Sequence, residues 1–93
     1  MRPISHVVPA AVMELLRRAP LSDGKVTFAW NTAVGPALER ATTVRLEGAT
    51  LIVETIGAQW TREIRRSSTV ILTRLKTFLG DGTVQRIEVR TRS

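Results

Sequence analysis

The sequence contains no cysteine and a single histidine, and its eight acidic residues are scattered along the chain. The absence of cysteine excludes disulfide bonds and cysteine-ligated metals, and it is typical of a reducing compartment. His6 lies near the N-terminus, whereas acid–base catalysis needs a positioned group. The acids form no metal-like cluster, and no glycine-rich phosphate loop follows a strand. We therefore expect no enzyme, metal, cofactor or small-molecule substrate.

Long apolar runs are missing as well. No stretch approaches the length of a membrane span. The apolar run near the N-terminus is interrupted by Glu14 and by the pair Arg17 and Arg18, too early for a secretory signal. We expect a soluble cytoplasmic protein, most simply a prokaryotic one, that does not enter the membrane.

Arginine is what the sequence has in excess. Fourteen lysine and arginine residues face eight acidic ones, which gives a net charge of +6, and only Lys25 and Lys76 of the fourteen are lysines. Arginine makes planar, bidentate contacts with phosphate and stacks on bases. The excess favours an anionic partner, with nucleic acid first and an acidic protein surface second. The alternative is that the charge serves solubility alone.

The first half of the 93 residues has helical spacing and forms part of a single domain. We predict a helix from about Pro9 to Arg18, with residues 1–7 fraying before it. Ser22 is a good N-cap for a second helix that ends at Gly35, and a short helical turn follows over residues 36–41.

After residue 42 the apolar period changes from 3.6 to 2. Residues 43–47 and 50–56 predict an antiparallel hairpin that turns at Gly48. A last strand, residues 84–90, follows the long helix and should cross over right-handed to pair in parallel. The prediction is an α+β domain of order α-α-β-β-α-β, with a three-stranded sheet, helices on one face, and the other face partly open. That open face would carry Arg45, Glu54, Arg86 and Arg90.

The long helix is predicted to run from Ala58 to Leu79 and to be amphipathic. Its core stripe comprises Trp60, Ile64, Ser67, Ile71, Leu75 and Phe78, which recur at steps of three and four. We expect Trp60 to be a core anchor, as we do Trp30, rather than a platform for bases. Basic residues occupy the opposite side.

These basic residues form the candidate nucleic-acid site. The set is Arg62, Arg65, Arg66, Arg74 and Lys76 on the helix, with Arg86 and Arg90 on the last strand as a second patch that Arg92 extends. A row of cations attracts phosphates through counterion release. The alternative is a solvated helix face without a partner.

Several short motifs resemble the DciA family of bacterial proteins, which is associated with the replicative DnaB-type helicase. They are Trp30, the Ala33–Pro36 segment (AVGP), residues 45–51 (RLEGATL) and the Ala58–Trp60 segment (AQW), followed by the apolar positions of the last strand. The resemblance implies a KH-like domain that binds DNA and helps to load or operate the helicase.

The sequence departs from related patterns at two places. It has no GxxG pair of the kind with which KH domains clamp a nucleic-acid backbone. Family members often carry His-Thr-x-Pro before the first strand, where this chain has residues 41–44 (ATTV). The basic helix face therefore replaces the clamp in our interpretation. Two other functions stay open: a general DNA- or RNA-binding module without a helicase role, and an interaction domain for an acidic protein.

Overall fold

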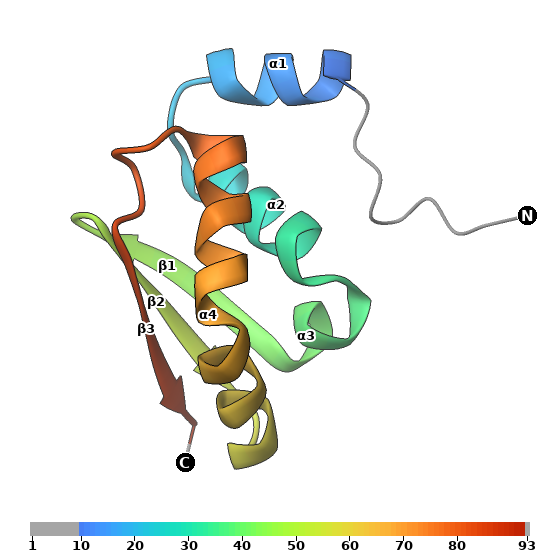
Figure 1. Ribbon diagram of the computed structural model, residues 1–93, viewed down its shortest axis with the longest axis vertical. Helices are drawn as coiled ribbons and strands as arrows, with labels where there is room; N and C mark the ends of the chain where they lie inside the picture. Colours follow the sequence, from blue (N-terminus) through green and yellow to red (C-terminus); the bar gives the residue numbers. More distant parts are fainter. Residues whose placement is uncertain (1–9, 93) are drawn as a thin grey trace, which may run out of the picture.

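A computed structural model describes residues 10–92 of the chain (Figure 1). The elements are α1 (Ala10–Arg18), α2 (Asp23–Val34), α3 (Pro36–Ala41), β1 (Thr42–Glu47), β2 (Thr50–Thr55), α4 (Ala58–Leu79) and β3 (Arg86–Thr91). The predicted order is confirmed, with α3 as the short helical turn. His6, the first predicted helical residue Pro9 and the expected fraying of residues 1–7 lie outside the described residues.

The three strands form one mixed sheet in the order β1-β2-β3. β1 and β2 are antiparallel, and their turn contains Gly48, whose positive φ of 61° suits glycine. β3 pairs with β2 in parallel after the crossover through α4. Helix α2 packs beside β1 and α4 beside β3, so both helices cover the same face of the sheet (Figure 1). This confirms the predicted α+β architecture.

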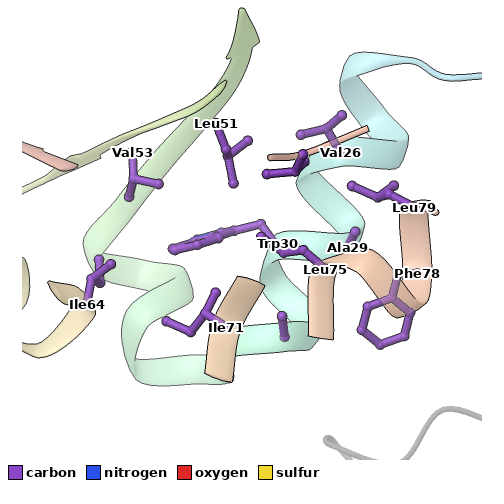
Figure 2. Close-up of a cluster of buried hydrophobic side chains, with 12 residues drawn as sticks. Val26, Ala29, Trp30, Leu51, Val53, Ile64, Ile71, Leu75, Phe78 and Leu79 are labelled. Carbon is purple, nitrogen blue, oxygen red and sulfur yellow. The ribbon is translucent and has the colours of Figure 1, made fainter. Parts of the chain in front are cut away.

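Trp30 is the largest fully buried side chain, at 1% exposure, which confirms its predicted place in the core. Figure 2 shows its indole between Leu51 and Val53 of β2 on one side and residues of α4 on the other. The indole N–H donates to the Thr42 hydroxyl at 2.9 Å. That hydroxyl donates in turn to the carbonyl of Leu38 at 2.6 Å. The polar edge of the indole is therefore satisfied inside the core.

The core stripe of α4 is confirmed at Ile64, Ile71, Leu75 and Phe78, which are all buried. The prediction for Trp60 is wrong, because its side chain is only half-buried and lies outside the core cluster. Thr61 is buried in the first turn of α4 instead. The reason is that α4 begins beside the polar ends of β2 and β3 rather than beside an apolar surface.

Three threonine hydroxyls join these polar ends. Thr55 donates to the carbonyl of Gly57, and its oxygen lies 2.7 Å from the Thr61 hydroxyl, which lies 2.6 Å from that of Thr91. Each hydroxyl has one proton, and that of Thr55 is already used. Thr61 therefore donates to Thr55, and Thr91 donates to Thr61. This directed chain fixes the start of α4 over the ends of two strands.

The opposite face of the sheet is open, as predicted, and its charges are paired within strands. Arg45 donates from Nε to Glu47 at 2.6 Å on β1, and Arg90 pairs with Glu88 on β3. The hydrogen bond and the attraction between the charges lower the pKa of Glu47 and raise the pKa of Arg45. Much of the positive charge on this face is therefore neutralised locally.

The Trp30–Thr42 hydrogen bond yields a prediction for stability. Thr42→Val keeps the side-chain shape but leaves the buried indole N–H without an acceptor, so it should lower the free energy of unfolding by about 1–3 kcal/mol. Thr42→Ser keeps the hydroxyl and should cost less. Urea unfolding followed by tryptophan fluorescence measures both, and equal losses for the two variants would contradict the role of the hydroxyl.

The Arg45–Glu47 pair yields a prediction for pH. In the folded chain Glu47 should titrate below its ordinary pKa, and Arg45→Gln should return that pKa toward the ordinary value. Because the folded-state pKa is depressed, the pair stabilises the fold above the unfolded-state pKa, and this contribution is lost as the pH falls through the folded-state pKa. NMR titration of the side-chain carboxyl measures it. An identical Glu47 titration in both proteins would refute the pairing.

Candidate nucleic-acid interface

Helix α4 and strand β3 enclose a groove of about 190 Å³. Its lining residues are Ser68, Thr69 and Leu72 from α4 and Gln85, Arg86 and Ile87 from β3 and the loop before it. The parallel register places Arg86 at the start of β3, opposite Thr50 of β2. The groove therefore has hydroxyl, amide and guanidinium groups along its sides and an aliphatic floor.

Cations follow this groove along α4. Arg62, Arg65, Thr69, Leu72 and Lys76 succeed one another at steps of three or four, so they lie along one flank of the helix. Arg86 lines the groove at the first position of β3, although the alternation along the strand starts its side chain on the open face that Glu88 and Arg90 share, as the sequence predicts. Among the described residues, no carboxylate lies within ion-pair distance of any of these four cations. Their charge is free to attract an anion along the whole groove.

The structure thus separates the seven candidate residues. Arg86 lines the groove, and Arg62, Arg65 and Lys76 share the flank of α4 that borders it. Arg66 pairs with Glu63, and Arg90 pairs with Glu88 on the open face of the sheet. Arg74 lies on the other flank of α4 and donates to the Ala33 carbonyl of α2 at 2.9 Å. The sequence assigned all seven to two basic surfaces, one on the long helix and one on the last strand. Charge spacing alone does not reveal which of them have hydrogen-bond or ion-pair partners within the fold.

The geometry of the groove suits a polyanionic chain. Guanidinium and ammonium groups bind phosphates, and hydroxyls and amides add hydrogen bonds to phosphate or sugar. No aromatic side chain lines the groove, so it offers no stacking platform of the kind that single-strand binders use. The arrangement can hold a backbone without reading its sequence.

Sequence reasoning missed the uncharged members of this groove. Nothing in the charge or apolar pattern points to Ser68, Thr69 or Gln85 as binding residues. Their position follows from the fold, since Ser68 and Thr69 lie one turn after Arg65 and meet Gln85 only when β3 pairs with β2. The spacing from Arg65 was the one available signal.

A second groove lies on the opposite flank of α4. It has a volume of about 410 Å³ and is lined by Val34, Ala37 and Leu38 from α2 and α3 and by Gln59, Trp60 and Glu63 from α4. Gly35, with a φ of 86°, makes the sharp turn between α2 and α3 that opens this groove. The half-buried Trp60 is its largest side chain, so this surface is mainly apolar.

Two further classes of site were sought in the described part of the chain. Residues 10–92 contain no group of three or more histidine, cysteine, aspartate or glutamate side chains arranged to hold a metal ion. None of the described helices combines the length and the apolar character needed to cross a bilayer.

Comparison with known proteins places this geometry in context. No individually curated protein matches the chain. A family model described as "Dna[CI] antecedent, DciA" matches residues 3–89, which is nearly the whole sequence and includes both flanks of α4. The chain therefore belongs to the DciA family of bacterial replication factors.

Proposed function

We propose that this protein is an accessory factor of bacterial DNA replication that binds DNA and assists the loading or operation of the replicative DnaB-type helicase. Such a factor acts in the cytoplasm, at the nucleoid. Membership of the DciA family supports the replication role. The DNA-binding part rests on one observation, the row of free cations along the α4–β3 groove.

The groove holds DNA through its phosphates. Arg86 lines this channel of hydroxyl and amide groups, and Arg62, Arg65 and Lys76 lie on the flank of the continuous helix that forms its wall. None of the four has a carboxylate partner among the described residues. Each phosphate neutralised there releases counterions, so binding should weaken steeply with salt and depend little on sequence. Arg62, Arg65, Lys76 and Arg86 carry this contact, and RNA is the runner-up ligand because both nucleic acids share the phosphate.

The helicase contacts the other flank of α4. A half-buried tryptophan in a shallow apolar groove is the type of residue that dominates protein interfaces. Trp60 is available there because the start of α4 meets threonine hydroxyls rather than the apolar core. Since the two grooves lie on opposite flanks of one helix, DNA and helicase can be bound at the same time.

A salt titration tests the DNA site. Arg62→Glu combined with Arg65→Glu should weaken binding to all sequences about equally and reduce the salt slope by about two. The matched control combines Arg18→Glu with Arg40→Glu, which changes the net charge by the same amount away from the groove. Fluorescence anisotropy with a single-stranded oligonucleotide measures both. Equal losses in the two double variants would refute the groove as the binding site.

A pull-down with the host's replicative helicase tests the second contact. Trp60→Ala should abolish or strongly weaken capture of the helicase while leaving oligonucleotide binding unchanged, and Trp60→Phe should restore part of it. If the wild-type chain binds DNA but never captures the helicase, the general nucleic-acid-binding module is the better description. If it captures a protein but no oligonucleotide at low salt, the protein-interaction domain is.

A further inference from the structure

A third cleft lies between α2 and α4. Helix α1 crosses the C-terminal end of α4 (Figure 1). The cleft has a volume of about 410 Å³ and is lined by Thr32 of α2 and by Arg74, Thr77 and Phe78 of α4. It is separate from the DNA groove, which lies on the β3 flank, and from the Trp60 groove, which lies at the start of α4. Neither proposed contact uses it.

Two guanidinium groups are held in place beside this cleft. Arg74 donates from one terminal nitrogen to the Ala33 carbonyl at 2.9 Å. Arg17 of α1 donates from Nε to the Thr77 carbonyl at 3.1 Å. A guanidinium has five N–H donors, so each group keeps several for an incoming anion. No acidic residue lines the cleft, and within residues 10–92 neither arginine has a carboxylate at ion-pair distance.

Exposed apolar side chains lie on the helices that border the same cleft. Phe28 lies one helical turn before Thr32 and is 46% exposed, and Val70 lies one turn before Arg74 and is 54% exposed. On α1, Leu15 is 70% exposed and Val12 is 39% exposed. The buried Phe78 forms part of the cleft wall. Apolar surface around positioned cations therefore continues from α2 and α4 onto α1.

We propose that this cleft is a docking site for an acidic peptide segment of a partner protein, one in which aspartate or glutamate flanks an apolar anchor side chain. The carboxylates bind Arg74 and Arg17, and the anchor packs among Phe28, Phe78 and Val70. Charge complementarity selects this occupant, because a second copy of a chain with a net charge of +6 would be repelled. Nucleic acid is the competing occupant, since Phe28 is exposed and could stack on a base, and the binding test below separates the two.

The site gives the protein a third contact that is independent of the DNA groove. The α4–β3 groove and this cleft lie on opposite flanks of α4. An acidic segment bound in the cleft therefore does not block the groove. The chain can therefore hold DNA and a partner's acidic segment together, and it can discriminate the segment from DNA by the apolar anchor.

Binding of a labelled model peptide to the whole chain tests the proposal. The probe is a fluorescein-labelled peptide of aspartate and glutamate around a central Phe-Leu pair. One control peptide replaces that pair by serines, and another replaces the acids by asparagine and glutamine. Only the probe should bind at moderate salt. Arg74→Glu and Thr32→Glu should each weaken it about tenfold or more, in line with the loss of a charge-assisted hydrogen bond.

Matched variants separate the cleft from general charge attraction. Arg62→Glu makes the same charge change on the other flank of α4 and should leave peptide binding nearly intact. Phe28→Ser should weaken the peptide but not an oligothymidine strand. Thermal unfolding of Thr32→Glu beside the wild-type chain separates a loss of peptide binding from a folding defect.

Three results would overturn the proposal. The first is no probe binding, or equal binding of the serine-substituted acidic peptide. The second is an equal loss of peptide affinity in the Arg62 and Arg74 variants. The third is displacement of the peptide by oligothymidine together with a loss of oligothymidine binding in the Arg74 variant, which would assign the cleft to nucleic acid.

Discussion

The burial of one helical stripe determines every surface of this molecule. Ile64, Ile71 and Leu75 of α4 pack against the sheet and Trp30. Burial of this stripe fixes the rotation of the helix about its axis, and so it fixes which residues lie on each flank. One flank must then face β3 and the other must face α2 and α3. The basic groove and the two apolar clefts are consequences of that single packing choice, which the hydroxyl chain at the start of α4 reinforces.

The two flanks differ because their facing elements differ. On the β3 flank the cations find hydroxyls and an amide, and no carboxylate competes for them in the described part. On the α2–α3 flank Glu63 neutralises Arg66, and Ala33 engages Arg74. Similar residues from one helix therefore serve an electrostatic surface on one side and a mixed, partly apolar surface on the other. This asymmetry underlies the proposal that a domain of 93 residues binds DNA and protein partners on different surfaces.

Much of the fold follows from periodicity, and the site follows only in part. The change from period 3.6 to period 2 located both strands of the hairpin, and Ser22 and Gly35 marked the two ends of the second helix. The sequence did not predict that Trp60 leaves the core, because the neighbouring threonine hydroxyls bond to one another only once β2 and β3 are paired. Nor did it reveal which arginines are free, since ion pairs such as Arg66–Glu63 depend on side-chain geometry.

The continuity of α4 has a consequence for the length of single-stranded DNA that the proposed contact would cover. An unbroken helix holds its residues at fixed separations along its axis. Arg62 and Lys76 are fourteen residues apart, so their backbones are about 21 Å apart along the axis at a rise of about 1.5 Å per residue. At about 3.4 Å per stacked nucleotide, that length corresponds to about six nucleotides. The footprint is then set by the rigid length of the helix and not by a loop that adapts to its ligand.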